Sequence, residues 1–137
     1  MHHRVLWAGA LLLAGCGGRL ATPVTARTSA GPEETFDCVK QQLKELGYKQ
    51  SSFDVDAHRI SATKIDDKTR RADTQFRRML NKIEVEVAPQ ADGQTSIQVA
   101  GRTLAEYTTQ RGPTEVEEKA SDEVRAAQQQ VAERCRS

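Results

Sequence analysis

The chain has 137 residues, with 20 Lys or Arg and 19 Asp or Glu, so its formal net charge is only +1. This length suits a single domain. Aromatic residues make up 4% of the chain, too few for a platform that stacks nucleic-acid bases. Without a basic excess or stacking residues, the composition predicts no nucleic-acid partner.

The N-terminal segment 1–15 has the layout of a secretory signal. It contains one fixed charge, Arg4, followed by ten uncharged residues from Val5 to Ala14. Ten residues of helix rise about 15 Å, half of the roughly 30 Å hydrocarbon core, so the stretch is too short for a stable transmembrane anchor. The basic start, the short apolar stretch and the small residues after it predict an export signal that is removed.

The end of this segment, Leu13-Ala14-Gly15-Cys16, resembles the lipobox of bacterial lipoproteins. The resemblance implies that Cys16 is diacylated, that residues 1–15 are removed, and that the new amino end is acylated. The chain would then be lipid-anchored in the cell envelope and face the periplasm, since two or three acyl chains make a durable anchor. By the same resemblance, Gly17 in place of an aspartate favours the outer membrane over the inner. The alternative is an ordinary signal peptide with an incidental cysteine, and no family is identified for the mature domain.

After the lipobox, residues 16–31 are rich in small and polar residues without apolar periodicity, which predicts a flexible leader. The single folded domain is expected to span 32–137. A helix should begin at Pro32, because proline suits a first turn and the two acids after it suit the positive helix end. Its apolar stripe is Phe36, Val39, Leu43 and Leu46. Gly47 should end it as a left-handed cap.

The apolar period then changes to two, which predicts four short strands at 52–56, 59–63, 82–87 and around 97–99. Residues 89–93 form a turn, and the shift of apolar phase at Gly101 suggests a β-bulge. His58, the only histidine outside the signal, lies in the first hairpin turn. With no serine-nucleophile or paired-carboxylate motif beside it, we interpret it as a solvated turn residue.

The segment 59–78 holds seven basic and three acidic residues, a net charge of +4. Its conformation from 66 to 78 is the least certain, and a helical turn through Ala72, Phe76 and Leu80 is one option. Arginine matches phosphate geometry well, so the segment could face an anionic lipid, a glycan phosphate or an acidic protein. The possible binding surface is Arg70, Arg71, Arg77 and Arg78. The alternative is a solvated loop that is partly paired with its own aspartates.

Thr114 and Glu117 form a capping-box pattern, which predicts a final helix from that point. Its stripe is Val116, Ala120, Val124, Ala127, Val131 and Cys135. With Cys16 lipidated, Cys38 and Cys135 remain in an oxidising compartment, where two cysteines most simply form a disulfide. A metal site would need more ligands than two cysteines and one histidine, and redox pairs are normally close in sequence.

The element order predicts a two-layer α+β domain, in which a four-stranded antiparallel sheet carries both helices on one face. No nucleotide, zinc or catalytic motif is present in the sequence, so we expect no cofactor, no metal and no enzymatic activity. The leading hypothesis is a membrane-anchored, non-enzymatic interaction or accessory module, for which an envelope protein is one possible partner and whose specific role the sequence does not identify. The alternative is a binder of an anionic lipid, a glycan or another small envelope ligand.

Overall fold

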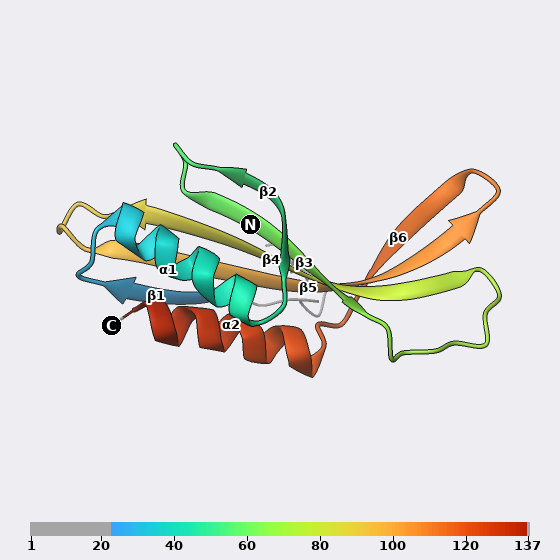
Figure 1. Cartoon of the computed structure of the whole chain (residues 1–137). Coiled ribbons are helices and arrows are strands. Elements are labelled where there is room, and N and C mark those ends of the chain that lie inside the picture. Colours follow the sequence, from blue (N-terminus) through green and yellow to red (C-terminus); the bar gives the residue numbers. More distant parts are fainter. Residues whose placement is uncertain (1–22, 137) are drawn as a thin grey trace, which may run out of the picture.

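Figure 1 shows a twisted antiparallel sheet with the two helices packed against one of its faces. The computed structural model describes residues 23–136. The elements in chain order are β1 (Val24–Thr28), α1 (Pro32–Glu45), β2 (Lys49–Asp54), β3 (Arg59–Asp66), β4 (Phe76–Pro89), β5 (Thr95–Thr109), β6 (Gly112–Glu118) and α2 (Asp122–Cys135). The sheet order is β1-β5-β4-β3-β2, and β6 pairs with β5. The predicted α+β class is confirmed, but the predicted four-stranded sheet is wrong, because six strands form it.

One additional strand, β1, lies inside the range 16–31 that we expected to be a flexible leader. It pairs antiparallel with β5 from Val24–Val99 to Thr28–Thr95. Its alternate residues Val24 and Ala26 pack against the core, and Thr28 is buried. The prediction of a leader is therefore wrong for Val24–Thr28. Its inward side chains are small, so the apolar alternation that marks a strand was weak.

The core lies between the sheet and the helices. Inward residues of the central strands, such as Ile83, Val85, Ile97 and Val99, form one cluster with the apolar stripes of α1 and α2. Gly101 continues β5 in unbroken register opposite Ile83, so the predicted bulge is wrong. A Cβ at Gly101 would lie 2.9 Å from side-chain atoms of Gln128 and Val124, both on α2. This glycine therefore permits close packing of the helix on the sheet.

The last helix begins seven residues later than the capping-box pattern predicted, because Gly112–Glu118 forms strand β6. Its N-cap is Ser121, whose hydroxyl accepts a hydrogen bond from the backbone N–H of Val124. The same hydroxyl donates to Asn81, and the backbone N–H of Ser121 donates to Thr103. These bonds fix the helix start to β4 and β5. The predicted stripe from Ala120 to Cys135 is buried, whereas Val116 is 48% exposed.

The predicted disulfide is confirmed: Cys38 and Cys135 are bonded, with their Cα atoms 5.7 Å apart. The bond joins α1 to the last residue of α2 across 97 residues of sequence.

Beyond the helices, β4, β5 and β6 extend into a separate end of the sheet (Figure 1). The expected helical turn at 72–80 is wrong, because β4 begins at Phe76.

Candidate functional site

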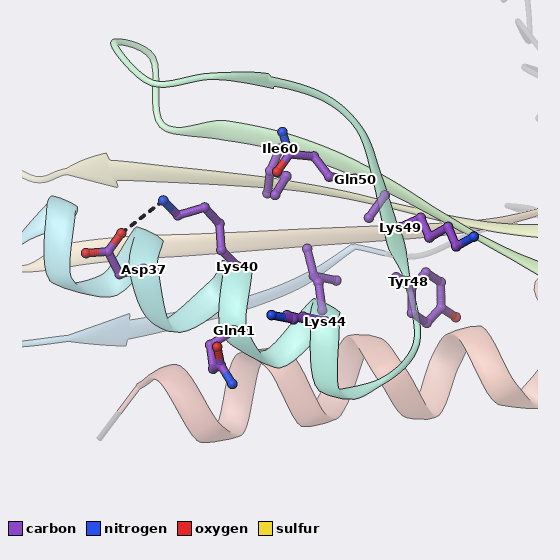
Figure 2. A pocket seen from close by; sticks show the side chains of 10 residues that line it. Asp37, Lys40, Gln41, Lys44, Tyr48, Lys49, Gln50 and Ile60 are labelled. Atoms are coloured by element: carbon purple, nitrogen blue, oxygen red, sulfur yellow. Dashed lines mark ion pairs between the residues drawn. The ribbon is translucent and has the colours of Figure 1, made fainter.

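An open cleft of about 600 Å³ separates α1 from the start of β2, and we call it the α1–β2 cleft (Figure 2). Its floor is apolar and consists of the buried side chains Leu43, Ile60 and Ala62. Its walls carry the polar residues Asp37, Lys40, Gln41, Lys44, Lys49 and Gln50. An apolar floor with a few polar groups around it is the usual composition of a binding site.

The cleft owes its shape to the end of α1. Gly47 adopts a φ of +85°, which a glycine tolerates without strain. Its N–H donates to the carbonyl of Lys44, and the N–H of Tyr48 donates to the carbonyl of Leu43. This pair of bonds is a Schellman motif, which ends the helix and turns the chain. The chain then continues as β2 beside the helix that it has just left, with the cleft between them.

The cleft has an excess of positive charge, with three lysines and one aspartate among its lining residues. Lys40 forms an ion pair with Asp37 at 3.1 Å and lies 5.2 Å from the ring centre of Phe36. Within residues 23–136, neither Lys44 nor Lys49 has an ion-pair partner, so their charges are uncompensated. An anionic group entering the cleft would meet the ammonium group of Lys44, whereas the side chain of Lys49 points away from the cleft (Figure 2).

Tyr48 closes one end of the cleft and is 5% exposed. Burial, with a smaller contribution from the carboxylate of Glu123, raises its pKa well above the ordinary value. Lys64 lies 5.9 Å from the Tyr48 ring centre and pairs with Glu123 at 2.7 Å. The phenol therefore stays neutral at physiological pH and cannot act there as a base.

The outer wall of the cleft is an edge strand. β2 ends the sheet order, and all six of its residues are exposed. At the tip of the β2–β3 hairpin, Phe53 is 51% exposed and Val55 is 57% exposed. A smaller hollow of about 340 Å³ extends the cleft to this tip and shares Asp37 and Lys40 with it. A continuous groove therefore runs along α1, walled by an unpaired strand edge.

His58 lies in the hairpin turn, as predicted, with a φ of +49°. Its ring packs edge-on against Phe36 at 5.4 Å between centroids. Its backbone carbonyl accepts a hydrogen bond from Val87. These contacts fix the hairpin to α1 and to β4, which gives His58 a structural role at the end of the groove.

The four arginines of the predicted binding surface do not come together. Arg71 donates to both carboxylate oxygens of Glu118 at 2.6 Å and to the Tyr107 hydroxyl at 2.8 Å. By the alternation of side chains along β5, these partners belong to the helix side of the sheet. Arg78 instead approaches Glu106 at 3.4 Å on the opposite side. The sheet thus separates Arg71 from Arg78.

The remaining two arginines also have partners. Arg77 lies 3.9 Å from Glu106, and Arg70 donates to the backbone carbonyls of Asp67 and Thr69. The hydrogen bonds with Glu118 raise the pKa of Arg71, and Arg71 lowers the pKa of Glu118. Much of the positive charge of segment 59–78 is therefore compensated by neighbouring carboxylates and carbonyl groups.

Sequence reasoning selected these arginines and missed the cleft lysines. The only local signal of the cleft lysines is the i, i+4 spacing of Lys40 and Lys44 on α1.

No helix between residues 23 and 136 is both long and apolar enough to cross a bilayer. The same residues contain no group of three His, Cys, Asp or Glu side chains arranged to hold a metal ion. Among models of known protein families and among curated proteins, none matches this chain.

Proposed function

We propose that this chain is a membrane-anchored envelope lipoprotein whose domain is a non-enzymatic interaction module. We further propose that the module binds an extended, acidic segment of a partner protein along β2. The observation that carries the proposal is the unpaired edge of β2 beside a cleft with an uncompensated lysine, Lys44. The lipid anchor rests on the lipobox at Cys16, which lies outside the described residues.

An exposed sheet edge offers unpaired backbone N–H and C=O groups to a further strand. A peptide that pairs with such an edge gains affinity from backbone hydrogen bonds and specificity from pockets for alternate side chains. The α1–β2 cleft lies directly beside β2 and supplies such pockets. One face of the added strand would contact the apolar floor formed by Leu43 and Ile60.

The composition of β2 distinguishes it from the β6 edge. Natural edge strands are commonly protected from pairing by charged side chains. β6 carries Glu115, Glu117 and Glu118, whereas β2 has four consecutive uncharged residues, Gln50 to Phe53. The third edge strand, β1, packs against α2 and contributes to the core. β2 is therefore the edge best suited to a partner.

The charge of the cleft indicates what kind of segment would fit. Lys44, which has no ion-pair partner among residues 23–136, favours carboxylate or phosphate groups. Exposed ion pairs each contribute up to about 1 kcal/mol. Because charge complementarity acts mainly on specificity and association rate, it selects acidic over neutral segments.

The experiment places a photo-crosslinking amino acid at Ser52 in the full chain, expressed in cells that process its signal. A matched probe at Thr114 on β6 is the control. Binding along β2 predicts one dominant adduct at Ser52, mapped to an acidic segment of a single partner, and little at Thr114. A synthetic peptide of that segment should bind the purified chain and slow hydrogen exchange in β2.

Charge reversal tests the role of the cleft lysines. Lys44→Glu should weaken binding of that peptide by about tenfold, since it replaces an attraction by a repulsion. Lys119→Glu, at an exposed lysine outside the cleft, should change it little. Equal adducts at Ser52 and Thr114, or an equal loss in the two variants, would contradict docking along β2.

A further inference from the structure

The sheet face away from the helices contains a row of apolar side chains at its distal end. Leu80 on β4 pairs with Ile65 on β3 and with Leu104 on β5, so the three form one line across three strands. Leu80 is 6% exposed and Leu104 is 8% exposed, although no helix covers this face. The neighbouring residues along these strands, Asn81 and Thr103, bond to Ser121, the N-cap residue of α2, which places the apolar row on the opposite face.

Charged rows border this apolar row on both sides. On one side, Lys49, Thr63 and Lys82 are aligned across β2, β3 and β4. On the other side lie Arg78, Glu106 and Glu115. Together these rows line a groove of about 480 Å³, which we call the open-face groove.

The charges along this groove are asymmetric. Within residues 23–136, Lys49 and Lys82 have no ion-pair partner. At the other border, Glu106 is paired with Arg78 at 3.4 Å, and Glu115 leaves a negative charge. The border formed by Lys49 and Lys82 is therefore positive. The border on the other side of the apolar row is neutral at the Arg78–Glu106 pair and negative at Glu115.

We propose that the open-face groove binds a single acyl chain with an anionic head. The chain lies over Leu80 and Leu104 and covers Ile65, which is 50% exposed without it. The head lies over Thr63, between the ammonium groups of Lys49 and Lys82. This site lies on the sheet face opposite the α1–β2 cleft and shares only Lys49 and Gln50 with its lining, and the inference goes beyond docking along β2.

The dimensions suit such a ligand. Adjacent strands are about 4.8 Å apart, so Lys49 and Lys82, two strands apart, can both reach one carboxylate placed between them. The groove volume falls within the range of small-ligand sites. Glu115 repels an anion at the far end, which sets the direction of the chain. Burial of the acyl chain against Ile65, the half-exposed member of the row, supplies the main attraction, since apolar contact area dominates such binding, and the nearly buried Leu80 and Leu104 add a smaller contact.

The test is a calorimetric titration of the full mature chain with dodecanoate below its micelle concentration. Acetate tests the need for the acyl chain, and the dodecyltrimethylammonium cation tests the need for the negative head. We expect binding of dodecanoate alone, with methyl resonances of Leu80, Leu104 and Ile65 shifting together. Equal binding of acetate, equal binding of the cation, or no binding of dodecanoate would overturn the proposal.

Two matched lysine variants locate the site. Lys82 lines only the open-face groove, and Lys44 lines only the α1–β2 cleft. Lys82→Gln should weaken dodecanoate binding by about fivefold, whereas Lys44→Gln should leave it unchanged. Ile65→Ser, a change at a half-exposed position, should weaken it by a similar factor. Weakening by Lys44→Gln and not by Lys82→Gln would assign the ligand to the cleft and refute the groove.

Discussion

Removal of the disulfide should cost this domain a large part of its stability. The bond between Cys38 and Cys135 closes a loop across 97 residues of sequence, nearly the whole domain. A loop of this length removes about 16 cal/mol/K of entropy from the unfolded chain, or about 4.7 kcal/mol at 25 °C. Cys135 is buried, so its replacement by alanine adds up to about 1 kcal/mol for the void.

The perturbation is the double variant Cys38→Ala, Cys135→Ala, which leaves no unpaired thiol in the domain. Urea unfolding followed by far-UV circular dichroism is the suitable assay, because the only tryptophan, Trp7, lies in the predicted signal. With a slope of about 1.5 to 2 kcal/mol/M, the loss of 4.7 kcal/mol lowers the midpoint by about 2 to 3 M urea. Wild-type protein that has been reduced before unfolding should show a similar midpoint.

A loss below about 2 kcal/mol in both samples would refute the reasoning. It would mean that the unfolded chain keeps residues 38 and 135 close together without the bond, so that the loop is not flexible. A large loss in the alanine variant with a small one in the reduced protein would assign the effect to the void at Cys135.

Three further predictions concern other parts of the chain. Gly101→Ala should cost about 1 to 3 kcal/mol in urea unfolding, because the added methyl overlaps side chains of α2, whereas Gly31→Ala, with open space around it, should be near neutral. Cys16→Ser should abolish lipidation and membrane attachment, measured by mass spectrometry and fractionation; a variant still bound to membranes would contradict the lipoprotein proposal. Arg71 lowers the pKa of Glu118 in the folded state, so the ion pair stabilises the folded domain. This stabilisation is complete above the ordinary glutamate pKa of about 4.3 and is lost as the pH falls through the lowered pKa of Glu118. Glu118→Gln should remove that part of the pH dependence, measured as the urea midpoint across the acid range.

The sequence predicted the elements with large apolar side chains at a clear period. Ile83, Val85 and Val87 form the inward face of β4 as expected, and Phe36, Val39 and Leu43 form that of α1. Their patterns are local and strong, so each element could be assigned without its neighbours.

The errors arose where local pattern and tertiary pairing disagree. Glutamates around Val116 favour a helix locally, yet β5 is long enough to pair with this segment from Thr103 to Thr109 and makes it a strand. Gly101 suggested a bulge, whereas its role depends on the approach of α2, which no local pattern encodes.

The candidate sites were harder to predict than the fold, because both combine residues far apart in sequence. Lys44 and Ile60 meet only when the hairpin returns beside α1, and Leu80 and Leu104 meet only through the register of β4 and β5. The arginine cluster was visible in the sequence as a run of charge. Its separation onto two faces, with Arg71 on one side and Arg78 on the other, required the strand positions.

The position of β1 also affects how the domain would respond to mechanical load. Residues 38–135 form a covalently closed ring, and β1, at Val24–Thr28, lies outside it. With the proposed lipid on Cys16, a pull from a bound partner reaches the domain through β1. Eight residues from Cys16 to Val24 extend at most about 28 Å, and peeling β1 from β5 would release about 17 Å more. Under load, β1 would then detach and lengthen the tether, while the disulfide-closed ring of residues 38–135 keeps the two helices joined to each other.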